Sequence, residues 1–311
     1  MNVTVKSAGH RRHTLRQFSG LSDNMLIGVI YAFLIFVLIV ILIPIINIIA
    51  SSFSSSKAVV AGKVTLWPVD FSLKGYQAVF NNRLIAGGFL NSLYYMVIGT
   101  SINLIVTMLA AYPLSHKSLV GRRAITFFFS FTMFFSGGMI PTYLVVKDLG
   151  MIDTVWAMVI PGAMSVYNVI IARTFMQNSI PYDLYESAMI DGCSYCKAFF
   201  RITLPLSKSV IAVLTLMFAV GHWNAYFGAL MYLRTQSKFP LQLVLRQILV
   251  LNSFNINDMT AGMVEDALDK QYLANLLKYS VIVVATTPLM ILYPFIQKHF
   301  VKGVMLGSIK G

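Results

Sequence analysis

Charged residues are scarce in this sequence. Only 11% of the 311 residues are Asp, Glu, Lys or Arg, whereas 57% are hydrophobic. A soluble globular domain carries about 25% charged residues. A soluble core of this size has no room for so much apolar surface, so the composition excludes an ordinary soluble globular protein and indicates a chain whose solvent is lipid.

Groups that support catalysis or metal binding are equally rare. The five His residues are dispersed, and no nucleophile, base and acid converge as a membrane-embedded enzyme requires. The two cysteines, Cys193 and Cys196, form a C-x-x-C pair. Zinc sites use four ligands, and a redox pair belongs in a thioredoxin-like context. We therefore predict no catalytic residue and no metal site, and we interpret the cysteines as small packing residues.

The phosphate-binding motif of nucleotide hydrolases is also missing. No G-x-x-x-x-G-K-[ST] occurs, so we do not expect the chain to hydrolyse ATP by itself. The net charge of +13 does not indicate nucleic-acid binding, because the basic residues are scattered through the segments that flank apolar stretches. That placement is typical of a membrane protein.

Long charge-free stretches are what the sequence has instead. A helix needs about 20 apolar residues to cross the hydrocarbon core. Six stretches have about that length or more: 24–56, 84–115, 124–146, 154–172, 209–233 and 279–297. A membrane β-barrel would show alternating segments of about ten residues. The sequence therefore predicts an all-α membrane protein with six transmembrane helices.

Six spans place both termini on one side of the membrane. If that side is the cytoplasm, the inside segments hold 14 Lys and Arg and the outside segments hold ten, which agrees with the excess of basic residues in cytoplasmic loops. The expected organisation is a basic cytoplasmic tail at 1–23, a transmembrane domain at 24–300 and a cytoplasmic tail at 301–311. Within the domain, a polar loop at 182–205 lies inside and a long loop at 234–278 lies outside.

Two features of these segments leave alternatives open. The apolar stretch 239–257 has Arg246 at its centre, which costs about 2.5–3.5 kcal/mol in a membrane, so we interpret it as an external or interfacial helix and not as a seventh span. Helix-breaking residues occur inside the predicted spans: Gly137, Gly138, Pro141, Pro161, Gly162 and Pro288. They are either ordinary transmembrane glycines and prolines or hinges around a translocation path.

One polar stretch interrupts the apolar pattern, YESAMIDGCSYCKAFFRITLPL at 185–206. It predicts a short helix at 182–190 with acidic residues near its N-terminus, where the helix dipole favours them. Gly192 then turns the chain, because glycine adopts positive φ cheaply. A second short helix follows with Ser194 as its N-cap, and Pro205 opens the fifth span. The resulting elbow on the membrane surface suits docking of another protein.

This stretch resembles the EAA loop of binding-protein-dependent ABC importer permeases. The order E-x-A-x-x-D-G begins at Glu186 and I-x-L-P ends at Pro205, just before the penultimate span, where the family has it. Ser187 departs from the family pattern, which has alanine there, and Cys193 stands where the family often has alanine.

The resemblance covers about residues 20–311. The motif WNAYFGALMYL at 223–233 and the tail FVKGVMLGSIKG at 300–311 are similar to those of the maltose-type carbohydrate branch. The stretch SGGMIPTYLVVKDLGMIDTVWAMVIPGA at 136–163 is similar to the six-span permeases associated with complex oligosaccharides, including those from pectin and alginate.

The family likeness implies a type I ABC importer transmembrane fold in the bacterial cytoplasmic (inner) membrane. It implies import of oligosaccharides by alternating access, with ATP hydrolysed elsewhere. The implied partners are a second permease subunit in a heterodimer, two ATPase subunits that hold MgATP, and an extracytoplasmic solute-binding protein. The chain itself would hold no cofactor.

The family likeness also assigns roles to residues. The residues that couple to the ATPase would be Glu186, Ser187, Ala188, Asp191, Gly192, Leu204 and Pro205. In the C-terminal tail, Gly307, Ser308 and Gly311 would reach the ATPase dimer.

The residues at the end of the fifth span suggest a substrate path. Trp223, Asn224, Tyr226 and Phe227 combine aromatic faces with an amide, which is what sugar recognition uses. The alternative is an aromatic belt at the outer membrane interface.

Two questions stay open. An ion-coupled secondary sugar transporter is the main alternative, although the spans lack the buried acids that such transporters use. An acidic oligosaccharide suits the basic outer residues Lys238, Arg246 and Lys270, but nearby acids weaken that argument. Neutral oligosaccharides, polyols and amino sugars are equally open.

Overall fold

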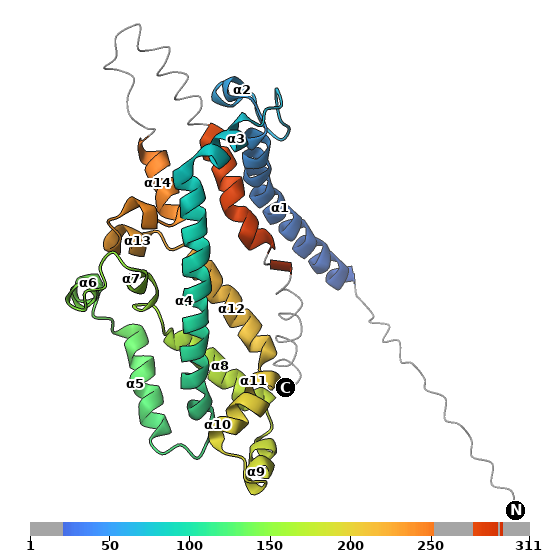
Figure 1. The fold of residues 1–311 in the computed structure, drawn as a ribbon. Helices are drawn as coiled ribbons and strands as arrows, with labels where there is room; N and C mark the ends of the chain where they lie inside the picture. The colour runs from blue at the N-terminus through green and yellow to red at the C-terminus, as the bar shows by residue number, and fades with distance from the viewer. Residues whose placement is uncertain (1–20, 252–275, 292, 295–311) are drawn as a thin grey trace, which may run out of the picture. The chain divides into compact units, whose positions relative to one another are not determined.

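The computed structural model describes residues 21–251, 276–291 and 293–294, and these residues are mostly helical (Figure 1). The α-helices are α1 Leu21–Ser52, α2 Ser56–Val60, α3 Lys74–Asn81, α4 Arg83–Ser115, α5 Arg122–Phe134, α6 Met139–Asp148, α7 Val155–Val159, α8 Val166–Ser179, α9 Tyr182–Ile190, α10 Tyr195–Ala198, α11 Leu204–Leu206, α12 Lys208–Trp223, α13 Phe227–Tyr232 and α14 Leu241–Leu251. A π-helix, Phe199–Thr203, joins α10 to α11, and a 3₁₀ turn, Gln236–Lys238, precedes α14. A further helix spans Leu276–Ile291. These ranges contain no β-strand, which confirms the all-α prediction.

The chain divides into two units, 1–47 and 48–311. In the first unit the described residues form a single helix, the greater part of α1. From Met25 to Ile46 its side chains are apolar and almost all exposed. A helix that is apolar all round has no polar face to turn toward water, so it belongs in lipid or against other apolar helices.

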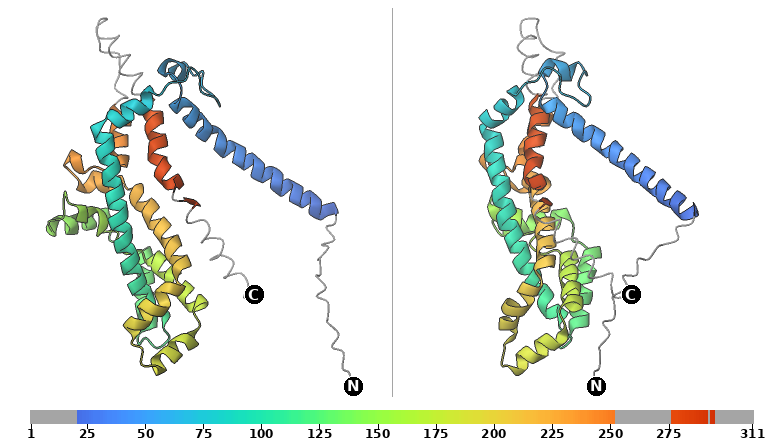
Figure 2. Two further views of the ribbon diagram at one scale, coloured as in Figure 1. Left: turned by 45° about the vertical axis from the view of Figure 1, so that its right-hand side comes forward. Right: turned by 90° about the vertical axis from the view of Figure 1, so that its right-hand side faces the viewer.

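Helix α4 organises the second unit. It has 33 residues, and α12, α8 and α14 all pack against it (Figure 2). Its buried face carries small residues, which permit close helix approach in membranes. At Gly99, for example, an added Cβ would overlap the ring of His222 on α12.

Two hydrophobic clusters follow one another along α4. The first surrounds Tyr95 and Met96 and joins α4 to the end of α12, to α14 and to the helix Leu276–Ile291. The second surrounds Met108 and Tyr112 and joins α4 to α8, to α12 and to residues of the predicted elbow. Each end of α4 therefore has its own core.

Within the described residues, the predicted spans are not all single straight helices. Two described helices are long and apolar enough to cross a membrane, Asn24–Ser52 and Arg83–Ser115. Two more candidates are bent pairs: α5 and α6 meet at 109°, and Tyr195–Leu206 meets α12 at 79°. The predicted span at 154–172 is divided between α7 and α8, and Leu276–Ile291 is a shorter apolar helix.

Glycine and proline account for two of these breaks. Gly138 has φ of +87° at the start of α6, and Pro161 and Gly162 separate α7 from α8. A broken helix frees backbone polar groups that a neighbour must satisfy in lipid. Asn103 of α4 does so here, because its side-chain amide donates to the carbonyl of Gly162 at 2.6 Å. Pro288, by contrast, lies within a continuous helix.

The described loops lie toward opposite ends of α4 (Figure 1). The α4–α5 loop and the elbow lie at its C-terminal end, where Tyr112 bonds to Tyr195 at 3.0 Å. The 234–241 segment lies at its N-terminal half, where Asn91 bonds to Ser237 at 2.7 Å. Each set of loops thus shares one side of the protein.

Candidate functional site

The elbow, residues 182–206, turns where the sequence predicted. Helix α9 ends at Ile190, and Gly192 follows with φ of +74°. The N–H of Cys193 donates to the carbonyl of Ala188 at 2.8 Å, and the N–H of Gly192 donates to the carbonyl of Met189 at 3.0 Å. These two bonds form a Schellman motif with glycine at its left-handed position.

The second arm of the elbow differs in part from the prediction. Ser194 is the N-cap of α10, and its hydroxyl accepts from the N–H of Lys197 at 3.4 Å, as expected. Pro205 does not open the fifth span, however. It lies in the short helix α11, and α12 begins at Lys208 after the 79° bend. The second arm of the elbow therefore ends at Leu206, and α12 is a separate helix after it.

The surface of α9 is open to solvent. Glu186 and Ser187 are exposed and Ala188 is half-buried. Asp191 is exposed at the C-cap, and among the described residues its carboxylate has no hydrogen-bond partner. An exposed acid beside small residues leaves this surface free to meet another protein.

The opposite surface of α9 is fixed to the membrane core through Tyr185. Its side chain is 4% exposed, and its hydroxyl lies 2.9 Å from Oγ1 of Thr203 in the other arm. Burial raises the pKa of this hydroxyl. The Tyr112 hydroxyl of α4 donates to the carbonyl of Tyr195 at 3.0 Å. These bonds connect both arms of the elbow with each other and with α4.

His116, directly after α4, completes this joint. Its ring meets Tyr185 edge-on at 4.6 Å between centroids, Tyr112 at 4.7 Å and Tyr195 at 5.9 Å. The side chain is 5% exposed and its Nε2 has no hydrogen-bond partner. Burial lowers the pKa of His116, so the neutral ring is the form that fits this aromatic cage.

A polar contact at mid-length of α4 connects three segments. Nε2 of His222 lies 2.8 Å from Oδ1 of Asn103, and the amide of Asn103 also satisfies the break at Gly162. His222 is thus a satisfied polar residue that holds α12 against α4 and, through Asn103, against the α7–α8 break.

Comparison with known proteins identifies this architecture. Residues 103–306 match the family of binding-protein-dependent transport system inner membrane components. The chain belongs to this permease family. The matched range includes the whole elbow.

Individual relatives agree with the family. The chain is 45% identical over 282 residues to the polygalacturonan/rhamnogalacturonan transport system permease protein YtcP of Bacillus subtilis (strain 168), covering 91% of this chain and 97% of that one. It is 43% identical over 270 residues to Protein LplC of the same organism, covering 87% and 90%. A crystal structure of a bacterial ABC transporter involved in the import of the acidic polysaccharide alginate matches with a TM-score of 0.81 and 33% identity, covering 91% of this chain and 99% of that one.

The predicted substrate-path residues of the permease separate into two groups. Trp223 is 1% exposed, its Nε1 donates to the carbonyl of Ala285 at 2.9 Å, and its ring meets Phe89 edge-on at 5.5 Å. Trp223 is therefore packed in the core, where it fastens α12 to the helix Leu276–Ile291. Asn224, Tyr226 and Phe227 are exposed, and their place on a substrate path stays a prediction.

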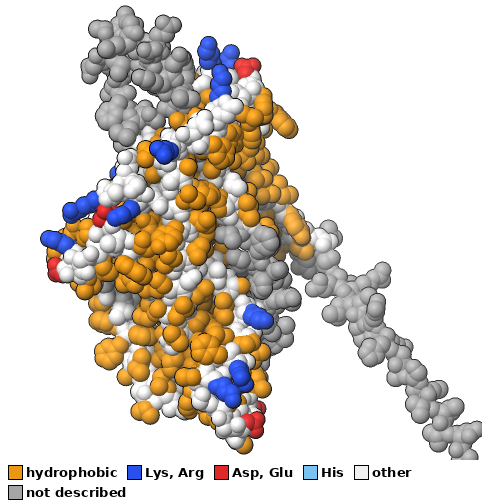
Figure 3. Space-filling view, in the orientation of Figure 1, with side chains coloured by type: hydrophobic (Ala, Val, Ile, Leu, Met, Phe, Trp, Pro, Cys, Tyr) orange, Lys and Arg blue, Asp and Glu red, His pale blue; other side chains and the backbone are white. Residues whose placement is uncertain are grey.

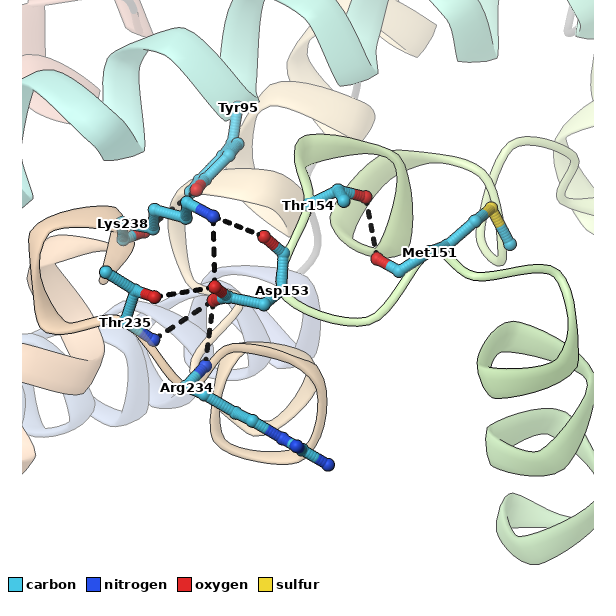
Figure 4. A network of polar contacts seen from close by, with 7 residues as sticks. All are labelled: Tyr95, Met151, Asp153, Thr154, Arg234, Thr235 and Lys238. Atoms are coloured by element: carbon cyan, nitrogen blue, oxygen red, sulfur yellow. Dashed lines mark hydrogen bonds and ion pairs between the residues drawn. The ribbon is translucent and has the colours of Figure 1, made fainter.

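Asp153 and the segment 234–238 of the permease form a polar network that the sequence did not reveal (Figure 4). Asp153, with φ of +60°, accepts from the N–H groups of Arg234 and Thr235 at 3.0 Å and from the Thr235 hydroxyl at 2.6 Å. Lys238 forms an ion pair with it at 3.0 Å. These hydrogen bonds lower the pKa of Asp153 below its ordinary 3.8. Those from Thr235 have the largest effect, followed by those from Arg234 and Lys238.

Other predicted residues have mixed outcomes. Cys193 and Cys196 are free thiols; Cys193 packs against the elbow core, whereas Cys196 is exposed. Leu204 is half-buried and Pro205 exposed. Gly307, Ser308 and Gly311 lie outside the described residues.

Asp153, His116 and Asn103 have structural roles that the sequence did not predict. Their only local signal was a polar side chain in or beside a charge-free stretch.

Proposed function

We propose that this chain is the transmembrane permease subunit of an ATP-driven oligosaccharide importer. It would pair with a second permease, bind two ATPase subunits through the elbow, and receive substrate from an extracytoplasmic binding protein. The elbow and both termini would lie in the cytoplasm. Family membership decides against the secondary sugar transporter that the sequence left open, since the family is one of binding-protein-dependent systems.

The observation that carries the proposal is the two-sided character of α9. One side is exposed and presents Glu186. The other is fixed by Tyr185, which is 4% exposed and bonded to Thr203. A push on the exposed side is therefore transmitted to α4 and α12 through packed side chains and is not absorbed by a loose loop. A coupling element needs this combination, since packed cores move between discrete arrangements.

The transport cycle follows from this arrangement. Closure of the ATPase subunits on MgATP would move the two elbows of the heterodimer and switch the spans from inward-facing to outward-facing. ATP shifts that equilibrium only by its different affinity for the two states. The chain supplies no catalytic residue to the hydrolysis.

An acidic oligosaccharide is the substrate class that the relatives favour. The relative with 45% identity is named for polygalacturonan and rhamnogalacturonan, and the solved transporter with 33% identity for alginate. These are polymers of, or containing, uronic acids. The basic residue Lys238 does not support the assignment, because Asp153 neutralises it.

ATP hydrolysis and sugar uptake by a reconstituted complex test the proposal. The permease pair, the ATPases and the binding protein are placed in proteoliposomes, and ATP hydrolysis is measured with oligogalacturonate, oligoalginate, and neutral arabino- and malto-oligosaccharides of equal length. We expect an acidic oligosaccharide to stimulate hydrolysis and to accumulate inside right-side-out vesicles. Stimulation by a neutral sugar alone would contradict the substrate class. Sugar uptake driven by an ion gradient without ATPase subunits would contradict the importer assignment itself.

A further inference from the structure

A polar pocket of about 290 Å³ opens beside the elbow. It lies between the end of α4, the start of α5 and the end of α8, and its polar lining includes Lys117, Arg122, Gln177 and Asn178. None of the described residues that line it is an Asp or a Glu. The pocket therefore offers donors and positive charge without a built-in counter-ion.

The basic groups around this pocket form no ion pair with any described residue. Arg122 donates one hydrogen bond of 3.4 Å to the carbonyl of His116, and Nε of Arg173 on α8 is buried without a partner. Within the part of the chain that the structure describes, the one ion pair is between Lys238 and Asp153 at the other end of α4. The guanidinium groups near the pocket thus keep their capacity to bind an anion.

Two further observations favour anion binding at this pocket. His116, which also lines the pocket, is 5% exposed and its Nε2 has no partner. Burial, and then the positive charge of Arg122, lower the pKa of Arg173, so these two like charges lie close enough to repel each other. Charge-assisted hydrogen bonds to an oxyanion would offset that repulsion.

The surroundings of the pocket favour a lipid over a soluble anion. Arg122 is the first residue of α5, and the next turns of this helix expose Phe127, Phe128 and Phe131 by 64%, 65% and 45%. Figure 3 shows that hydrophobic side chains dominate the face that carries α4 and α5. The phosphate of a phospholipid would therefore meet the basic pocket, and its acyl chains would meet the apolar surface of α5. Basic pockets at the cytoplasmic ends of membrane helices bind lipid headgroups in this way.

We propose that this pocket binds the phosphate group of an anionic phospholipid, with Lys117 and Arg122 as its cationic ligands. Arg173 adds positive charge close to Arg122. Tyr182 and Tyr185 of α9 also line the pocket, so a bound headgroup contacts the elbow directly. This site goes beyond the transport function and does not depend on which sugar is carried.

The test uses the purified complex in mild detergent after removal of its lipids. Phosphatidylglycerol and phosphatidylcholine are titrated separately, and lipid adducts on the permease are counted by native mass spectrometry. The variants are Lys117→Gln/Arg122→Gln and Arg122→Lys. The matched control is Lys208→Gln, which removes an exposed basic residue at the start of another apolar helix, α12, on the same side of the protein.

The site predicts one high-affinity phosphatidylglycerol adduct on the wild type and on Lys208→Gln, with phosphatidylcholine binding more weakly. Loss of charge-assisted hydrogen bonds makes the double variant bind phosphatidylglycerol at least about tenfold more weakly than the wild type. The single variant Arg122→Lys, which keeps the positive charge, retains part of the wild-type affinity. Three results would overturn the proposal. In the first, the double variant binds phosphatidylglycerol as tightly as the control does. In the second, millimolar inorganic phosphate displaces the lipid; in the third, the double variant binds lipid normally but loses the ATPase subunits. The last would assign the basic residues to a carboxylate of the partner.

Discussion

The two ends of α4 are held in different ways. At the end near Asp153, backbone N–H groups, a hydroxyl and the Lys238 ammonium all converge on one carboxylate. At the end near His116, aromatic rings pack on one another, and His116 Nε2 and Arg173 Nε are left unpaired. Buried polar groups normally have partners. At the first end the polar groups bond to one another, whereas the second end leaves two buried nitrogen atoms without partners among the described residues.

The largest loss of stability is expected when the buried Tyr185 side chain of the elbow is removed. Tyr185→Ala removes a buried aromatic ring, which costs about 3–5 kcal/mol in folding free energy, whereas Tyr185→Phe removes only the bond to Thr203 and costs about 0.5–1.5 kcal/mol. Thermal unfolding of the detergent-solubilised complex measures both. Tyr182→Ala is the control, because Tyr182 lies one turn earlier and is 38% exposed. Equal losses for Tyr182→Ala and Tyr185→Ala would show that Tyr185 is not the anchor.

A smaller effect is expected at the turn of the elbow. Gly192→Ala places a Cβ in open space but at φ of +74°, and a left-handed L-residue costs about 1–2 kcal/mol. Gly221→Ala lies inside α12 at ordinary φ and should be neutral or stabilising by about 0.5–1 kcal/mol. Hydrogen exchange of the α9 amides reports the difference. Unchanged protection in Gly192→Ala would mean that the Schellman motif does not limit opening of the elbow.

Acid should destabilise the two ends of α4 at different pH values. Burial lowers the pKa of His116 from 6.5, so the unfolded chain binds this proton more readily, and the stability that the neutral ring gives is lost as pH falls below 6.5 toward the lower folded value. The pKa of Asp153 is lowered from 3.8, so its contribution persists until pH falls below 3.8.

Hydrogen exchange of the complex at pH 7.5 and pH 5.5 compares the two ends directly. We expect α9 and α10 to lose protection at pH 5.5, corrected for the intrinsic rate, while residues 234–238 do not. His116→Phe should abolish the change at the elbow. Loss of protection at both ends, or at the outer end alone, would refute the assignment to His116.

The smallest effect is expected from Asp153→Asn, because the network is at the surface. The variant loses the ion pair with Lys238 and the charge on bonds to Arg234 and Thr235, so the amides of those two residues should exchange faster while the elbow is unchanged. Asp148→Asn is the matched control, since Asp148 is exposed and has no ion pair among the described residues. An equal change in amide exchange in both variants would show that Asp153 does not hold the segment at Arg234 and Thr235.

Local patterns predicted local structure. The turn at Gly192, the cap at Ser194 and the sorting of loops to two sides all follow from residue type and span length, which are properties of neighbouring residues. Pro205 was misplaced because the π-helix and the 79° bend before α12 leave no mark in a pattern of apolar residues.

Long-range contacts were out of reach. Trp223 bonds to Ala285, 62 residues away, and Asn103 to His222, 119 residues away. Residue type alone allowed Trp223 to line a path or to fill a core, and only the packed structure decides between them. The Asp153 network was missed for the same reason, since its carboxylate meets residues about 82 positions later.

The claim that the elbow is the coupling surface is tested most directly by reversing the charge of Glu186. Glu186→Lys and the control Asp183→Lys, which reverses an exposed acid in the first turn of the same helix, are reconstituted with the ATPases and binding protein, and substrate-stimulated ATP hydrolysis and uptake are measured together. We predict that Glu186→Lys reduces uptake about tenfold or more, since a lost charged contact with the partner subunit is worth about 2–5 kcal/mol, while Asp183→Lys retains most of it. Wild-type uptake by Glu186→Lys with intact stimulation would contradict the account.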